Sequence, residues 1–202
     1  MAEAQPQSSP QAAGAPDVAA VLRYACYLAF RSWAKFGPAS LAVILLMPAA
    51  QLEWLLPLAI IAMFVLLITG IILVSRLLLL WQCYRVVRAY PVAEFRSPVE
   101  KVALHATEKR LMLRLGGGAE SPEQRAVNFS GGARWPRDIE NGVWFYGDDA
   151  FGGVAVVAAT LELLFMQPRN WGSAERFRRA AGPERERRAR RAGIHQPVRA
   201  RW

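Results

Sequence analysis

The sequence WLLPLAIIAMFVLLITGIILVS, residues 54–75, decides the fold of the chain, because it holds twenty-two consecutive residues without a charge. As an α-helix rising about 1.5 Å per residue it is about 33 Å long, enough to cross a hydrocarbon core of about 30 Å. Fourteen of these residues are Leu, Ile, Val or Phe, and each contributes roughly −0.3 to −0.6 kcal/mol to membrane insertion. A chain of 202 residues is too short to surround so long a helix that is apolar on every face. The stretch therefore predicts a transmembrane helix.

A second apolar segment, FGPASLAVILLMPAAQL at residues 36–52, precedes the first. It has only seventeen residues, so it reaches full membrane thickness only by including residues before Phe36. Lys35 and Arg31 then lie at the lipid head groups, which long cationic side chains can reach from a deeper position. The two segments predict a helical hairpin with a minimal turn, unless the first segment is re-entrant.

Basic residues on both sides of this hairpin predict its orientation. Lys and Arg are retained on the cytoplasmic side of a membrane, whereas acidic residues count for little. Basic residues precede and follow the hairpin, and the turn between its two segments has none. We therefore expect a protein of the cell inner (plasma) membrane with both termini in the cytoplasm. The expected membrane-interface residues are Arg23, Arg31, Trp33, Lys35, Trp54, Arg76, Trp81, Arg85 and Arg88.

The segments that flank the hairpin differ in character. Residues 1–16 have no apolar period and are expected to form a disordered tail. In residues 17–36, a helix is indicated by Asp17 as its start and Gly37-Pro38 as its stop. A polar row at four-residue spacing and several aromatic residues favour an interfacial helix on the inner leaflet, with an extension of the first spanning helix as the alternative. Residues 76–90 are expected to be a juxtamembrane helix.

From residue 91 the apolar period changes from helical to alternating. Leu111, Leu113 and Leu115 alternate with polar or larger neighbours, and glycine-rich turns separate four further short runs. We expect about five or six antiparallel strands in residues 91–172, a compact sheet or small barrel filled by aromatic side chains. The predicted fold class is α+β: a two-helix transmembrane hairpin, a small antiparallel cytoplasmic β domain and a basic C-terminal tail.

Three features of the sequence are shared with a known group of proteins: the segments WFYGDDAFGGVAVV and ELLFMQPRNW, and a bias of 22 Arg against 3 Lys. Over residues 75–171 the chain resembles uncharacterised two-helix membrane proteins of high-GC actinobacteria. The resemblance implies a membrane location. It implies no activity and assigns no functional residue.

Motifs for catalysis or metal binding are weak in this sequence. His105 and His195 are ninety residues apart, which does not support a zinc site with three protein ligands. Asp148 and Asp149, with Glu162, could form a carboxylate pair or a divalent-ion site, but a turn between strands favours Asp and Gly for backbone reasons alone. We therefore expect no catalytic residue, no cofactor and no metal, and a protein that is not an enzyme.

Residues 173–202 hold ten Arg against three Glu, a net charge of +7 out of the chain's +9. Near an anionic leaflet each basic residue contributes about 1 kcal/mol, so anionic lipid head groups are the first expected partner of this tail. Nucleic acid is the alternative, because clustered Arg binds phosphate without sequence preference. The expected contact residues are Arg176, Arg178, Arg179, Arg185, Arg187, Arg188, Arg190 and Arg191.

These features predict a membrane-anchored β domain that acts as an interaction or scaffold module for a protein partner at the inner face of the membrane. A nucleic-acid-associated accessory protein of DNA transfer is one alternative. A membrane-associated enzyme or transporter subunit is the other, although two helices without an embedded acidic or His residue argue against transport.

The predicted orientation is tested by accessibility to a membrane-impermeant reagent. Single cysteines placed in residues 1–16 and 173–202 should react only from the cytoplasmic side, and one at Glu53 only from the outer side, because the flanking basic residues are retained inside. A C-terminal reporter that is active only in the periplasm would contradict this orientation.

Overall fold

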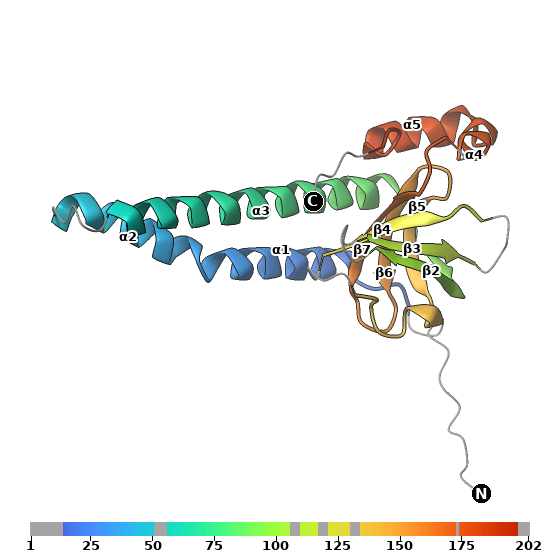
Figure 1. The fold of residues 1–202 in the computed structure, drawn as a ribbon. Coiled ribbons are helices and arrows are strands. Elements are labelled where there is room, and N and C mark those ends of the chain that lie inside the picture. The colour runs from blue at the N-terminus through green and yellow to red at the C-terminus, as the bar shows by residue number, and fades with distance from the viewer. Residues whose placement is uncertain are drawn as a thin grey trace, which may run out of the picture. The chain divides into compact units, whose positions relative to one another are not determined.

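The protein is described by a computed structural model that covers residues 14–50, 56–105, 110–116, 121–129, 134–172 and 174–197 (Figure 1). The chain divides into two compact units. Arg23–Trp81 form the helical unit, and Met1–Leu22 together with Gln82–Trp202 form the β unit. The predicted disordered tail lies almost entirely outside the described residues, as does Trp54.

Three helices open the chain: α1 (Val18–Ala34), α2 (Gly37–Ala50) and α3 (Leu56–Ala89). The carboxylate of Asp17 accepts hydrogen bonds from the backbone N–H groups of Ala19 and Ala20 at 3.0 and 3.2 Å. This side chain caps the free N–H groups of the first turn, which confirms the predicted helix start. Helix α3 is continuous over 34 residues, so the predicted spanning and juxtamembrane helices are one element.

The chain turns between α1 and α2 at Lys35 and Phe36. The indole of Trp33 lies against Gly37, where a Cβ atom would overlap the ring. Pro38 follows in the first turn of α2, a position that tolerates proline because its missing N–H would have no helical partner. Gly37-Pro38, predicted as the stop of one helix, therefore begins the next.

Within the helical unit, α1 lies beside α3. The guanidinium of Arg76 donates a hydrogen bond to the hydroxyl of Ser32 at 3.4 Å, and Figure 1 shows the two helices side by side with opposite chain directions. Among the described residues, one helix, Leu56–Ala89, is long and apolar enough to cross a membrane. Helix α2 has 14 residues and is shorter than the predicted segment 36–52.

The β unit contains one antiparallel sheet of seven strands in the order β1-β5-β6-β7-β4-β3-β2. The α+β class and the antiparallel sheet are thus confirmed. Strand β1 has only three residues and was not among the predicted strands. The strands are β1 (Glu94–Arg96), β2 (Val99–His105), β3 (Arg110–Leu115), β4 (Gln124–Asn128), β5 (Val143–Asp148), β6 (Gly152–Val157) and β7 (Leu163–Pro168).

The two edge strands of this sheet are neighbours in the sequence. Strand β1 ends at Arg96 and β2 begins at Val99, so only Ser97 and Pro98 join them. A fully extended chain covers about 3.3 to 3.6 Å per residue, which keeps the facing ends of β1 and β2 within about 11 Å. The sheet must therefore curl until its opposite edges approach each other.

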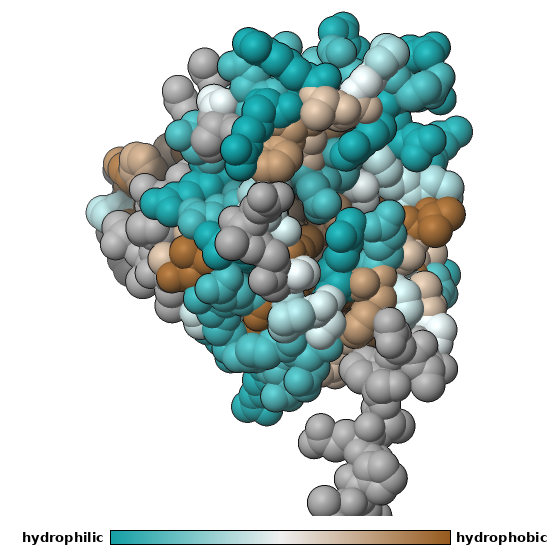
Figure 2. Space-filling model, turned by 90° about the vertical axis from the view of Figure 1, so that its right-hand side faces the viewer, coloured by the Kyte–Doolittle hydropathy of each residue, from teal (hydrophilic) through white to brown (hydrophobic). Residues whose placement is uncertain are grey.

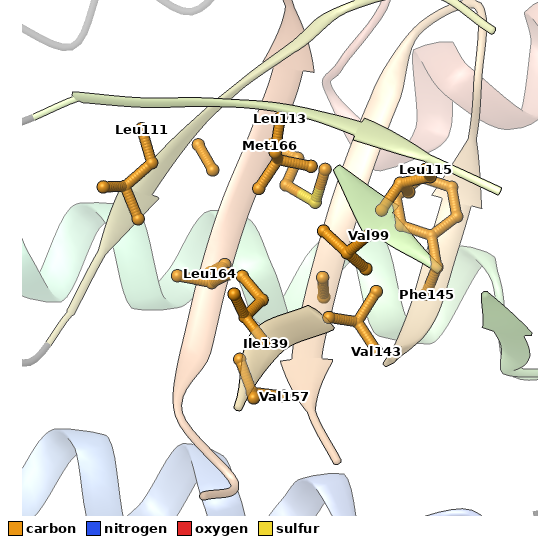
Figure 3. Close-up of a cluster of buried hydrophobic side chains, with 12 residues drawn as sticks. Val99, Leu111, Leu113, Leu115, Ile139, Val143, Phe145, Val157, Leu164 and Met166 are labelled. Atoms are coloured by element: carbon orange, nitrogen blue, oxygen red, sulfur yellow. The ribbon is translucent and has the colours of Figure 1, made fainter. Parts of the chain in front are cut away.

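The curled sheet encloses a hydrophobic core (Figure 3). Alternate residues of each strand point inward, as the pleat requires. Most of these side chains are aliphatic, in contrast to the predicted aromatic filling: Phe145 belongs to the cluster and Trp135 packs against it. The other members are Val99, Leu111, Leu113, Leu115, Ala126, Ile139, Val143, Ala155, Val157, Leu164 and Met166.

A short 3-10 helix (Ile139–Asn141) precedes β5. Two further helices follow the sheet, α4 (Glu175–Ala180) and α5 (Gly182–Ala192). They occupy most of the segment that the sequence predicted to be a tail, and they belong to the β unit.

Leu161, in the turn between β6 and β7, provides a test of backbone strain. Its φ is 56° and its side chain is 51% exposed, and an L-residue in this left-handed region costs roughly 1–2 kcal/mol. Leu161→Gly should therefore be about 0.5–1 kcal/mol more stable than Leu161→Ala. Both variants lose the leucine side chain, but alanine keeps the Cβ atom that makes the left-handed conformation unfavourable. Urea unfolding of the full chain in detergent measures the difference. A lower midpoint for the glycine variant would show that this turn is unstrained.

Candidate functional site

The outer face of the sheet is buried over β6 and β7, although an antiparallel sheet commonly leaves one face to solvent. Val154, Val156, Leu163 and Phe165 point to this face and are at most 3% exposed. Their strands are nearly continuous apolar runs rather than alternating ones, which is the sequence pattern of a strand buried on both sides. Something must therefore cover this face.

The C-terminal region contributes to that cover. Ala189, Ala192 and Ile194, at the end of α5 and just after it, are fully buried. The amide of Gln167 on the outer face donates to the carbonyl of Gln196 at 3.3 Å. On β5, burial raises the pKa of Tyr146, and the negative charge of Asp17 raises it further. The predicted basic tail is thus folded against the sheet.

One ion pair holds α5 to the hairpin between β5 and β6. Arg185 donates two hydrogen bonds to the carboxylate of Asp148, at 2.5 and 2.7 Å. The side chain of Asp148 is only 4% exposed, and it also accepts the backbone N–H of Ala150 at 2.9 Å. A buried carboxylate needs such partners, because an unpaired charge is strongly disfavoured away from water. We call this contact the Arg185–Asp148 clasp.

The glycines around Asp148 have a structural reason. Gly152 has a φ of 96°, and a Cβ atom there would overlap the carbonyl oxygen of Met166 on β7. A Cβ at Gly153 would overlap the carbonyl oxygen of Tyr146 on β5. The sequence GDDAFGG therefore forms a tight hairpin that passes close to both neighbouring strands and presents Asp148 to α5.

The neighbouring aspartate has a different environment. Burial raises the pKa of Asp149, although the guanidinium of Arg96, 3.4 Å away, lowers it. Its backbone carbonyl accepts a hydrogen bond from Gln124 at 2.9 Å. Glu162, the third acid considered for an ion site, instead accepts a hydrogen bond from Asn128 at 2.7 Å.

The three carboxylates thus have separate protein partners. In the part of the chain that the structure describes, no group of three metal-ligating side chains gathers.

The C-terminus of α5 is fastened to the end of α3. Gln82 and Arg85 donate hydrogen bonds to the carbonyls of Ala192 and Arg191, at 2.7 and 2.9 Å. These carbonyls have no partner within α5, and a cation placed there also interacts favourably with the helix dipole. Gly193 ends the helix in the left-handed conformation, with a φ of 74°. Arg85, expected at the membrane interface, therefore binds α5.

Tyr90 directly follows α3 and is 7% exposed. The pKa of its phenol is raised to about 12, mainly by burial and also by the negative charge of Asp148, while Arg188 and Arg185 act in the opposite direction. The guanidinium of Arg188 lies 5.7 Å from the centre of the Tyr90 ring, within range of a cation–π interaction. Arg188 is thus a second arginine of α5, after Arg185, whose side chain contacts another part of the β unit.

The eight arginines expected to bind lipid or nucleic acid thus have differing environments. Arg185 pairs with Asp148, and Arg188 lies against the ring of Tyr90. Arg178 donates a hydrogen bond to the carbonyl of Trp171 at 2.6 Å, and Arg176 lies over the ring of Phe177. Arg191 is exposed at the end of α5. Surface pairs with neighbouring glutamates engage the remaining three: Arg179–Glu175, Arg187–Glu184 and Arg190–Glu186.

The expected membrane-interface residues lie on α1, α3 and the turn between α1 and α2. Arg23, Arg31, Lys35, Trp81 and Arg88 are exposed. Trp33, Arg76 and Arg85 are half-buried, each beside a partner already described.

At the sheet end of Figure 1, the surface seen in Figure 2 is mostly hydrophilic, with small separate hydrophobic patches. Comparisons with known proteins add no assignment: the chain matches no protein-family model, no curated protein and no solved structure.

The two adjacent aspartates should respond oppositely to neutralisation. Asp148→Asn should lower the free energy of unfolding by about 2 kcal/mol, because it removes the charged acceptor of the clasp. Arg185 is 51% exposed and can be rehydrated, so the loss stays below the roughly 3–5 kcal/mol of a fully buried pair. Hydrogen exchange of β5, β6 and α5 in the full chain measures this loss of stability.

Asp149→Asn is the matched control and should leave stability unchanged or slightly raised at neutral pH. The folded-state pKa of Asp149 is raised, so its contribution to stability is greatest at low pH and falls as the pH rises through that pKa. Equal losses of stability in the two variants would show that the Arg185–Asp148 clasp stabilises the fold no more than the Asp149 carboxylate does.

Proposed function

We propose that this protein is anchored in the inner membrane by a helical hairpin and that its β unit serves as an interaction or scaffold module at the cytoplasmic face. The observation that carries the proposal is the exposure of α3. Only 6% of its most apolar stretch is buried, whereas the core helix of a soluble protein is mostly covered.

Large apolar side chains are exposed along the length of α3 before Arg76. Leu58, Ile61, Phe64, Ile68 and Ile71 are between 47% and 59% exposed. In water this surface would be unfavourable by roughly 25 cal/mol per Å², and contiguous apolar patches of this kind mark membrane or protein contacts. The part of α3 before Arg76, twenty residues from Leu56, has a length of about 30 Å, which matches the hydrocarbon core.

The second leg of the hairpin combines α2 with the end of α1. Helix α2 alone is about 21 Å long at about 1.5 Å per residue, which is too short to cross. Residues of α1 that lie along α3 supply the missing length, since Ser32 contacts Arg76. This arrangement supports two crossings and both termini on one side.

The basic residues of α4 and α5 support contact with anionic lipid. Residues 174–197 carry eight Arg and three Glu. Asp148, which lies outside this region, compensates the charge of one of these eight, Arg185. The net charge left on this region is about +4, and each basic residue near an anionic leaflet contributes about 1 kcal/mol. The Arg residues of this region without an ion pair in the described chain are Arg176, Arg178, Arg188 and Arg191.

A protein partner is the second element of the proposal. The β unit is small, and the carboxylates first considered for chemistry bind other residues of the chain. In a domain that is tethered to the membrane, a sheet face covered by other parts of the same chain leaves the remaining surface free to contact other proteins without a change of fold.

The proposal is tested in membranes and in reconstituted vesicles. The full chain should stay in the membrane pellet after alkaline extraction. Hydrogen exchange of α4 and α5 should be slower in vesicles that contain phosphatidylglycerol than in pure phosphatidylcholine, and the difference should vanish near 1 M salt, where the Debye length is about 3 Å.

The matched variants separate charge from shape. Arg188→Gln/Arg191→Gln should weaken the lipid effect, and Arg188→Lys/Arg191→Lys should keep it, because lysine retains the charge. Release by alkaline extraction would refute the anchor. Equal exchange in both lipids would refute the lipid contact, and protection by added duplex DNA alone would favour the nucleic-acid alternative.

A further inference from the structure

We infer that α3 carries the contact face of a membrane dimer, and that the partner on this face is α3 of a second copy of this chain. This inference rests on the proposed membrane anchor and adds a self-association that the anchor alone does not require. It starts from a hollow on the surface of α3, centred on Gly70.

The hollow lies on a side of α3 where large apolar side chains are exposed. Its volume is about 560 Å³. Among the described residues, a Cβ atom added at Gly70 would meet no atom within 4 Å beyond its neighbours and the backbone of its own helix. Four large side chains around it, those of Met63, Leu67, Ile71 and Val74, are between 53% and 57% exposed. The hollow is thus an open notch between bulky neighbours.

Within the described chain, Gly70 has no packing role that accounts for it. A glycine in a helix interior costs about 1 kcal/mol relative to alanine, and in membrane helices glycine serves the close approach of another helix or side chain. Gly37 has such a neighbour, because the indole of Trp33 lies where its Cβ would be. The corresponding space at Gly70 is open. The notch therefore indicates a contact made with another molecule.

A second copy fits this notch because of symmetry. Copies of one chain enter the membrane in the same orientation, so a two-fold axis along the membrane normal places each residue of α3 at the depth of its counterpart. Gly70 of one copy then faces Gly70 of the other, and the two backbones can approach closely there. A helix of another protein would need its own small residue at this depth, whereas a second copy always supplies one.

The spacing of the lining residues fits a pair of helices. Met63, Leu67, Gly70 and Val74 follow one another at intervals of four, three and four residues, which is the seam of a left-handed helix pair. At 3.6 residues per turn, three other exposed side chains lie about 160° to 180° around the helix from Gly70. These are Ile61, Ile68 and Ile72. The two sets separate a contact face from a lipid-facing one.

The area of this face sets the strength of the dimer. A helix with its side chains is about 10 Å across, so a third of its circumference over 30 Å of hydrocarbon is about 300 Å² per copy. The pair then buries about 600 Å², less than the roughly 1,200–2,000 Å² of a stable complex in water. Confinement to one plane raises the effective concentration of the copies. We therefore expect a reversible dimer whose fraction rises with the protein-to-lipid ratio.

The first experiment is oxidative cross-linking of the full chain in vesicles. The background is Cys26→Ser, and Cys83 is kept because it is fully buried. Single cysteines on the contact face should give several-fold more disulfide-linked dimer than those on the opposite face, because a disulfide needs Cα atoms within about 7 Å. The contact-face variants are Met63→Cys, Leu67→Cys, Gly70→Cys and Val74→Cys, and the opposite-face variants are Ile61→Cys, Ile68→Cys and Ile72→Cys.

The second experiment measures energy transfer between donor- and acceptor-labelled copies at several protein-to-lipid ratios. The label is placed at Val92→Cys, which is 77% exposed in the β unit. Gly70→Leu fills the notch and should weaken association by roughly tenfold or more, the effect of overpacking a close contact. Ile72→Phe adds bulk to the opposite face as the matched control and should leave association unchanged. Hydrogen exchange of the β unit should be the same in both variants.

Equal disulfide yields on the two faces, or energy transfer that Gly70→Leu leaves unchanged, would overturn the dimer. No energy transfer at any protein-to-lipid ratio would overturn it as well, and would mean that lipid chains fill the notch. In each case a chain that stays in the membrane pellet after alkaline extraction would still support the anchor. Release from the pellet would overturn the anchor and the dimer together.

Discussion

The link of two residues between β1 and β2 constrains the whole β unit. Ser97 and Pro98 connect opposite edges of a seven-stranded sheet, so the sheet has to curl, and one of its faces becomes an enclosed core. The inner residues are mostly aliphatic because alternate positions of short strands converge on a small interior.

Closure leaves the outer face of β6 and β7 to be covered by other parts of the chain. The segment after α5 contributes to this cover through the hydrogen bond between Gln167 and Gln196. The Arg185–Asp148 clasp holds α5 to the sheet, and the caps from Gln82 and Arg85 hold α5 to the end of α3. An arginine-rich segment thus has a structural role beside any role in binding lipid. Its alanines lie inward and most of its arginines outward, so one helix serves both.

Helix α3 runs without a break from the helical unit into the β unit. A helix satisfies its backbone hydrogen bonds internally, which is what a hydrocarbon environment requires, and α3 continues for 34 residues without a break. The same helix that exposes apolar side chains in the helical unit supplies Gln82 and Arg85 to the β unit. On the proposed function, membrane insertion and the fold of the domain therefore depend on opposite ends of one element.

The sequence by itself determined the elements whose signal is local. Residues 54–75 indicated a spanning helix by uninterrupted apolarity, Asp17 indicated a helix start, and the alternation of Leu111, Leu113 and Leu115 indicated an antiparallel strand. It did not reveal β1, whose three residues are too few for a period, nor the identity of the core, which depends on which strands meet.

Only the tertiary structure decided the role of the C-terminal arginines, because charge along a chain does not tell which partner a side chain finds. Asp148 and Arg185 are 37 residues apart, and nothing in either segment specifies the other. The continuous apolar runs of β6 and β7 signalled burial on both faces, yet they do not tell that a segment about 30 residues later, at Gln196, contacts the outer face. Long-range pairing follows from folding as a whole.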